Sequence, residues 1–273
     1  MPVPAPDPQS PDTQIWDGPD GTPAAYFYPA DSAYWVQLPG IGSYRVSPEG
    51  DVLAVPEDAA PQSLVLDAYR RTVLPQALQF FGHEVLHASA VVTEGGVVGF
   101  CAYSKTGKST LAFALAGRGY RPWADDALLF ETTAGEARTL ALPFAIRLRP
   151  ASRDYFRVDP LPVEGSPAAN GSVSVGREAL PLKALSVLTR AEEGEKERVV
   201  ERVSPGDAVP SLLPHAYWVS LRDEKRKARM VRAYLDVAGS VPVYRIRVPH
   251  DLDQLPALLD EIERVVLERP GAA

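Results

Sequence analysis

The chain has little cysteine, no long apolar run and no excess of basic residues, and each shortage excludes a class of protein. Its 273 residues contain one cysteine, Cys101, which excludes an intrachain disulfide and a cysteine-based zinc site. No stretch of about 18 apolar residues is present to form a membrane-spanning helix. The first residues also lack the basic segment and the apolar run of a signal peptide. We therefore expect a cytoplasmic protein that has no membrane partner.

The net charge of −7 is concentrated near the N-terminus. Residues 1–60 hold nine acidic residues and one basic residue, so they carry −8 and the other 213 residues carry +1. Proteins that bind nucleic acids usually neutralise phosphates with many clustered lysines and arginines. The body of this chain has no such excess, and we expect no nucleic-acid partner.

The composition is that of a globular protein with many loops, because 45% of the residues are hydrophobic and 27 are proline. Residues 1–22 are mostly polar residues, proline and glycine, and we expect a flexible tail. Residues 23–82 combine short aromatic and β-branched runs with one kinked helix or two short helices broken at Pro75. This pattern predicts a β-rich N-terminal unit and a linking helix.

In residues 83–273 predicted strands and helices alternate, which indicates an α/β core.

A phosphate-binding motif ends at Gly107-Lys108-Ser109. The motif G-x-x-x-x-G-K-[ST] joins a strand to a helix, because successive backbone N–H groups and the helix N-terminus must converge on phosphate oxygens. The flanking segments here predict such a strand and helix, which disfavours a chance match. Ala102 replaces the first glycine and lacks its freedom at positive φ. The candidate nucleotide-binding residues are Ser104, Lys105, Thr106, Gly107, Lys108, Ser109 and Thr110.

Two adjacent acids, Asp125 and Asp126, follow Lys108 by seventeen and eighteen residues. A kinase needs one carboxylate near its metal ion and another that accepts the proton of the acceptor hydroxyl. Neighbouring side chains on a strand point to opposite faces. We therefore expect the two acids to share these roles only if they lie in the loop before the predicted strand.

Residues 86–130 resemble the catalytic core of the HPr kinase/phosphorylase family, and in particular its shorter relatives such as the lasso-peptide precursor kinases. The resemblance implies a P-loop core like that of HPr kinase and phosphoenolpyruvate carboxykinase over 83–273, beside the small β-rich N-terminal unit. The segments that carry it are Leu86-His87-Ala88-Ser89-Ala90-Val91, a Gly-Gly turn, Gly99-Phe100, Gly107-Lys108-Ser109-Thr110, Arg118-Gly119 and Ala124-Asp125-Asp126.

The resemblance also implies roles for single residues. Lys108 would hold the transferred phosphoryl group, Asp125 would accept the hydroxyl proton, and His87 would lie beside the phosphates. Ser109 and Asp126 would bind Mg²⁺.

Two parts of the family pattern have no clear counterpart, namely a downstream metal-binding glutamate and a late arginine loop. Arg147 and Arg149, predicted on one strand face, and the basic run 222–232 are candidates to meet an acidic ligand or to face water.

Two functions remain open. The first is a Mg²⁺- and ATP-dependent kinase that phosphorylates a serine-type hydroxyl of a peptide or small protein, for example the precursor of a ribosomal peptide natural product. A free small molecule is an alternative acceptor. The second is a nucleotide-binding regulatory or scaffold module without transfer, which Ala102 and the missing glutamate favour and the acid pair disfavours. The sequence does not define the oligomeric state, and a homo-oligomer is one of the possibilities.

Overall fold

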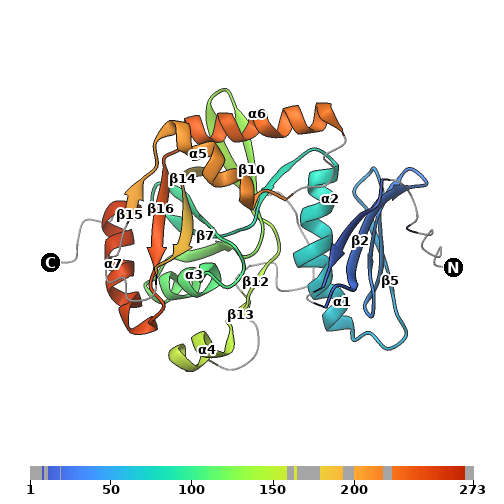
Figure 1. The fold of residues 1–273 in the computed structure, drawn as a ribbon, viewed down its shortest axis with the longest axis horizontal. Coiled ribbons are helices and arrows are strands. Elements are labelled where there is room, and N and C mark those ends of the chain that lie inside the picture. Colours follow the sequence, from blue (N-terminus) through green and yellow to red (C-terminus); the bar gives the residue numbers. More distant parts are fainter. Residues whose placement is uncertain are drawn as a thin grey trace. The chain divides into compact units, whose positions relative to one another are not determined.

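The computed structural model describes residues 8, 12–18, 20–158, 163–164, 179–192, 200–217 and 223–267. It contains both sheets and helices, as predicted for an α/β protein, and divides into two compact units (Figure 1). The first unit comprises Met1–His83 and Tyr217–Ala228, and the second comprises Glu84–Ala216 and Arg229–Ala273.

One segment falls outside the unit to which we had assigned it. We predicted a single core over 83–273, whereas Tyr217–Ala228 groups with the first unit. The guanidinium of Arg226 donates to the backbone carbonyls of Gln79, at 3.2 Å, and of His83, at 2.9 Å. These contacts join residues more than 140 positions apart, so no local pattern in the sequence indicates them.

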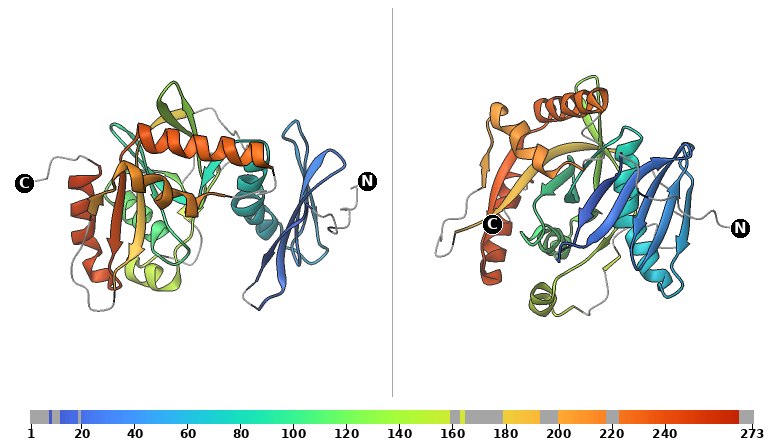
Figure 2. Two further views of the ribbon diagram at one scale, coloured as in Figure 1. Left: turned by 45° about the horizontal axis from the view of Figure 1, so that its top comes forward. Right: turned by 45° about the vertical axis from the view of Figure 1, so that its right-hand side comes forward.

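The first unit is a five-stranded antiparallel sheet with a helical segment on one face (Figure 2). Side chains alternate between the faces of a strand, and Phe27, Tyr34 and Tyr44 form a core with Val65 and Ala77 of the helices. The strand order is β1-β2-β3-β4-β5. The elements are β1 (Gln14–Asp17), β2 (Pro23–Ala30), β3 (Ala33–Leu38), β4 (Gly42–Val46), β5 (Val52–Pro56), α1 (Gln62–Ala68), a π-helical turn (Tyr69–Val73) and α2 (Leu74–Phe80).

Part of the predicted tail is a strand. Residues 1–7, 9–11 and 19 lie outside the described residues, but Gln14–Asp17 forms β1 and pairs with β2. The ring of Trp16 lies 4.5 Å from that of Phe27 and packs against the core of the sheet. The prediction of a flexible tail over 1–22 is therefore wrong for β1, because Trp16 gives this segment a large apolar side chain to bury.

The break predicted at Pro75 is a change of helix type. The chain is helical from α1 through the π-helical turn to α2, and Pro75 lies in the first turn of α2. Proline has no backbone N–H and its ring clashes with the carbonyl four residues before it, and the wider π-helical turn, in which the N–H of Leu74 donates to the carbonyl of Tyr69, precedes it directly.

The second unit is built on a nine-stranded sheet in which β14 is the central long strand. None of the described helices is long and apolar enough to span a bilayer. The strands are β6 (Glu84–Leu86), β7 (Ala88–Thr93), β8 (Gly96–Cys101), β9 (Arg121–Ala124), β10 (Leu128–Thr133), β11 (Glu136–Leu140), β14 (Ala179–Arg190), β15 (Val200–Arg202) and β16 (Val243–Val248), with β12 (Ala145–Ile146) and β13 (Val163–Glu164) as a separate pair. The helices are α3 (Lys108–Gly117), α4 (Pro150–Phe156), α5 (Pro205–Leu212), α6 (Glu224–Ser240, whose first turn belongs to the first unit) and α7 (Leu255–Val265), with 3₁₀ turns at Leu213–His215 and Leu252–Gln254.

Three parallel strands end at the same edge of this sheet. β14 pairs in parallel with β8, with Val187 opposite Cys101, and in parallel with β16, with Arg190 opposite Val248. In α/β sheets, ligands bind beyond the carboxyl ends of parallel strands. The loop that follows β8 is the one that carries the phosphate-binding motif.

Helices α3 and α7 share a hydrophobic core with β8, β14 and β16. The amphipathic stripe predicted for the C-terminal helix is confirmed, because its members are all buried in this core: Leu255, Leu258, Leu259, Ile262 and Val266. Tyr234 on α6 packs edge-on against Phe130 of β10, with 5.3 Å between ring centroids. The shared core fixes β8 and α3, the elements on either side of the motif loop.

Candidate functional site

The motif loop, residues 102–109, connects the end of β8 to the start of α3. Lys105 and Gly107 have positive φ values of 74° and 117°, and the first helical hydrogen bond runs from Leu111 N to Gly107 O at 2.9 Å. Ala102 is fully buried and is not among the residues with positive φ. Alanine in place of the first glycine therefore adds no backbone strain. The N-terminal amides of α3 face the loop, as an anion-binding loop requires.

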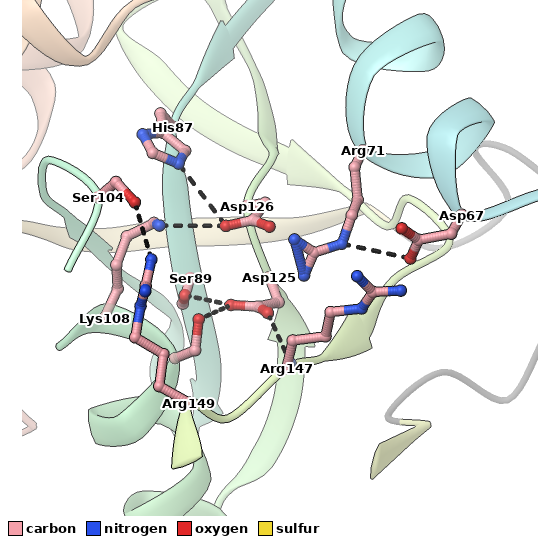
Figure 3. Close-up of polar contacts among 11 residues, drawn as sticks. Asp67, Arg71, His87, Ser89, Ser104, Lys108, Asp125, Asp126, Arg147 and Arg149 are labelled. Carbon is pink, nitrogen blue, oxygen red and sulfur yellow. Dashed lines mark hydrogen bonds and ion pairs between the residues drawn. The ribbon is translucent and has the colours of Figure 1, made fainter. Parts of the chain in front are cut away.

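The acid pair lies in a bend between β9 and β10, outside both strands. Asp126 has a φ of 67°, in the left-handed region. This conformation breaks the alternation of neighbouring side chains, so both carboxylates reach α3. Figure 3 shows the two acids and the residues that contact them.

Asp125 is buried and is held mainly through one of its two oxygens. Oδ1 accepts hydrogen bonds from Ser89 Oγ at 2.6 Å and from Ser109 Oγ at 2.8 Å. Oδ2 accepts a long hydrogen bond, 3.4 Å, from the backbone N–H of Arg147. Burial, and then the negative charge of Asp126, raise the pKa of Asp125, while the two serine hydroxyls and the Lys108 charge oppose this shift.

Asp126 contacts two other predicted site residues. Its Oδ1 lies 3.1 Å from Lys108 Nζ and 3.6 Å from His87 Nε2 (Figure 3). The side chain of Lys108 is only 7% exposed, so this ion pair offsets a charge that is largely shielded from solvent. The structure thus brings His87, Lys108, Asp125 and Asp126 together within one unit.

His87 lies in the break between β6 and β7, where we predicted continuous strand. Its backbone N–H donates to the carbonyl of His215 at 2.7 Å, because Leu86 forms a bridge with Ala216 there. The loss of regular pairing at His87 turns its side chain toward Asp126.

His215 is a residue of the site that the sequence does not signal. Its side chain is buried, and its Nδ1 makes no hydrogen bond within the described part of the chain. Its ring lies 5.0 Å from that of Tyr103 in the motif loop. Burial, and then the positive charges of His87 and Lys108, together lower the pKa of His215 to about 4.

Two arginines reach the motif loop from other elements. Arg149 Nη2 donates to Ser104 Oγ at 3.4 Å, and Arg190 Nη2 donates to the carbonyl of Lys105 at 3.2 Å. The prediction that Arg147 and Arg149 share a strand face is wrong, because β12 ends at Ile146 and Arg149 precedes α4 as its N-cap.

The remaining hydroxyls of the motif have different surroundings. Thr110 lies on α3, and its Oγ1 is 2.9 Å from Ser152 Oγ on α4. Thr106 is buried, and its backbone N–H donates to the carbonyl of Tyr103 at 3.3 Å. The first contact fixes α4 to α3, and the second closes the turn of the loop.

The oxygen donors around Ser109 fit Mg²⁺, which takes oxygen ligands and usually keeps several waters beside one or two carboxylates. Ser109 Oγ and Asp125 Oδ1 lie 2.8 Å apart, and Asp126 follows directly in the bend. Among the described residues, no group of three or more His, Cys, Asp and Glu side chains is placed to hold a metal ion by itself. In this structure Ser109 contacts Asp125, and the binding of Mg²⁺ by Ser109 and Asp126 stays a prediction.

Taken together, the site pairs a loop that has the backbone conformation and charge suited to anion binding with two carboxylates. Lys105, Lys108, Arg149 and Arg190 place positive charge around the loop, and the amides of α3 add partial positive charge. The carboxylates can bind a cation or accept a proton. This combination suits the binding of a polyphosphate next to a group that gives up a proton.

No protein-family model matches the chain, and no curated protein matches it. Among solved structures, the Hpr(Ser) kinase/phosphatase from Coxiella burnetii is similar with a probability of 1.00, a TM-score of 0.34 and 15% sequence identity. The similar region covers 68% of this chain and 99% of that chain. A likeness of this degree is distant and establishes neither a family nor an activity.

Proposed function

We propose that this chain is a Mg²⁺- and ATP-dependent phosphotransferase that moves the terminal phosphoryl group of ATP to a serine-type hydroxyl of a peptide or small protein. The observation that carries the proposal is the contact of the motif with the acid pair. Lys108 lies 3.1 Å from Asp126, and Ser109 lies 2.8 Å from Asp125. A loop that only binds a nucleotide does not require a second, buried carboxylate at its lysine and serine.

The proposal assigns the binding of ATP to the motif loop. Its backbone N–H groups and the N-terminus of α3 would bind the phosphate oxygens, and Lys108 would leave Asp126 to bind the β- and γ-phosphates. Asp126 is then available with Ser109 to hold Mg²⁺. When bound, Mg²⁺ would neutralise part of the phosphate charge and orient the terminal phosphoryl group.

Asp125 is the proton acceptor in this proposal. Its Oδ1 accepts from Ser89 and Ser109, whereas among the described residues its Oδ2 accepts one long contact, from the Arg147 N–H, and is the oxygen that we assign to the acceptor proton. Burial raises the pKa of Asp125, which brings it closer to the pKa of an effective general base near neutral pH.

The reaction has a simple balance. The bond between the γ-phosphorus and the bridging oxygen breaks and leaves its electron pair on ADP, while the acceptor oxygen forms a new bond to the phosphorus. The proton of the hydroxyl passes to Asp125 Oδ2. The products are ADP, the phosphate ester and one proton.

Label transfer tests the proposal. Purified protein would be incubated with Mg²⁺, γ-labelled ATP and a library of peptides with internal and C-terminal serines, with Lys108→Ala in parallel. We expect label on at least one peptide, and a loss of at least about 100-fold in Lys108→Ala because a group that stabilises transferring charge is removed.

Lys227→Ala is the matched control, because Lys227 is an exposed lysine on α6. It should transfer label at the rate of the unaltered protein. If ATP binds but no peptide receives label, a peptide kinase is contradicted and free hydroxyl compounds become the acceptors to test. If the label on a peptide is the same in Lys108→Ala, the motif loop does not perform the transfer.

A further inference from the structure

We propose that Arg149 binds the terminal phosphoryl group of the nucleotide and stabilises its charge during transfer, an inference that rests on the proposed function. Phosphoryl transfer depends on positioning and on positive charge at the three non-bridging oxygens of the moving group. Lys108 supplies one cation from the loop itself.

The position of Arg149 is set by its contact with the motif loop. Its Nη2 donates to Ser104 Oγ, and Ser104 stands in the third position of the motif, four residues before Lys108 (Figure 3). The contact is long, at 3.4 Å, and its acceptor is a neutral hydroxyl. A guanidinium exchanges such a partner for a phosphate oxygen with a net gain, because hydrogen bonds between two charged groups are shorter and stronger.

The second observation is the charge of the Arg149 guanidinium. Within the part of the chain that the structure describes, its guanidinium contacts no carboxylate, whereas Lys108 is paired with Asp126 and Arg118 with Asp260 and Glu263. Because Arg149 lies beside the motif loop without such a partner, its guanidinium is available to bind a phosphate group there.

The backbone of Arg149 is fixed by its place at the start of α4. Arg149 is the N-cap of α4, and its carbonyl accepts the N–H of Arg153 at 2.9 Å. α4 is fixed to α3 by the Thr110–Ser152 contact and by the rings of Phe113 and Phe156, whose centroids are 5.0 Å apart. The backbone of Arg149 is therefore placed relative to the motif, while its exposed side chain can turn.

The other two arginines near the site have different tasks. Arg190 donates to two backbone carbonyls, those of Lys105 and Pro249, the latter at 2.7 Å, and so ties the loop to the ends of β14 and β16. Arg147 contacts Asp125 through its backbone N–H. The guanidinium of Arg149, by contrast, donates to a side chain of the motif loop, the hydroxyl of Ser104.

In the transfer step, Arg149 would donate its N–H groups to non-bridging oxygens of the phosphoryl group as the bond to ADP breaks and the bond to the acceptor forms. No proton leaves Arg149, because the guanidinium is charged throughout. The contact should be strongest when the moving group is planar between donor and acceptor.

Binding of a planar phosphoryl mimic tests this without an acceptor. The probes are Mg²⁺ with ADP alone and Mg²⁺ with ADP and aluminium fluoride, measured by calorimetry for the unaltered protein, Arg149→Ala and Arg149→Lys. We expect Arg149→Ala to weaken the aluminium fluoride complex at least about 100-fold, as for a lost transition-state contact, and to change ADP affinity less than about threefold. The affinity of Arg149→Lys for Mg²⁺, ADP and aluminium fluoride should lie between those of the unaltered protein and Arg149→Ala, because lysine keeps the charge and loses the paired donors.

Arg232→Ala is the control for a lost charge, since Arg232 is 79% exposed and pairs with Asp236 on its own helix. It should bind both probes as the unaltered protein does. Equal weakening of both probes in Arg149→Ala, or weakening of neither, would overturn the role of Arg149 and leave the proposed function standing. If the unaltered protein binds ADP but forms no aluminium fluoride complex, the proposed function fails and this inference fails with it.

Discussion

Asp125 and Asp126 are neighbours in the sequence, and their different partners separate their chemistry. Asp125 is enclosed by two serine hydroxyls and is buried, whereas Asp126 pairs with Lys108 and lies near His87. Removal from water raises the pKa of Asp125, whereas the carboxylate of Asp126 lies beside the Lys108 ammonium. Two adjacent acids can in this way serve as a base and as a ligand of a cation.

At the same scale, the motif could be predicted from the sequence and its partners could not. Residues 104–110 are contiguous, and a contiguous pattern defines a loop and its backbone geometry. Ser89, Arg149 and His215 join the site through pairings between distant segments, such as the bond between His87 and His215. A sequence pattern does not contain those distances.

The lowered pKa of His215 makes the stability of the protein depend on pH. Its pKa of about 4 in the folded protein lies below the ordinary value of 6.5. As the pH falls from about 6.5 toward 4, the unfolded chain therefore binds a proton that the folded chain does not, and stability falls. Between about pH 7.5 and about pH 5 we expect His215 to lower the free energy of unfolding by about 2 kcal/mol.

Urea unfolding at the two pH values measures this effect. His215→Leu should lose less stability on acidification than the unaltered protein, because leucine does not titrate. His83→Leu replaces an exposed histidine and is the control. Equal losses in His215→Leu and the unaltered protein would show that His215 is not held in its neutral form.

At the scale of elements, α3 is held at both of its ends. Its N-terminus carries the motif, and Arg118 at its C-cap donates to Asp260, Glu263 and the carbonyl of Pro256 on α7. A cation at a helix C-terminus also interacts favourably with the helix dipole. The two helices that share the core with β8 are thereby joined at the surface as well.

Arg118→Ala should lower the free energy of unfolding by about 1–2 kcal/mol, because it removes several charge-assisted hydrogen bonds at a partly exposed site. Chemical denaturation measures the change. Arg245→Ala is the matched control, since Arg245 and Glu201 form a single pair in which both side chains are exposed. That variant should lose less than about 0.5 kcal/mol. Equal effects in the two variants would contradict the role of Arg118.

At the scale of the whole molecule, segments with a clear period or motif were predicted better than segments set by distant contacts. The strand, loop and helix around Lys108 and the apolar stripe of α7 follow local patterns. The grouping of Tyr217–Ala228 with the first unit depends on contacts of Arg226 with α2 and His83. β1 depends on one partly buried tryptophan, Trp16, which packs against the core of the first unit.

The central claim is that the motif loop binds ATP and that Asp125 takes the proton during transfer. The most direct measurement compares ATP affinity and label transfer in Asp125→Asn and in the unaltered protein, under the same conditions. We predict ATP affinity within about threefold and a transfer rate lower by at least about 100-fold, as expected for a lost general base. Transfer that persists in Asp125→Asn at the unaltered rate would contradict the account.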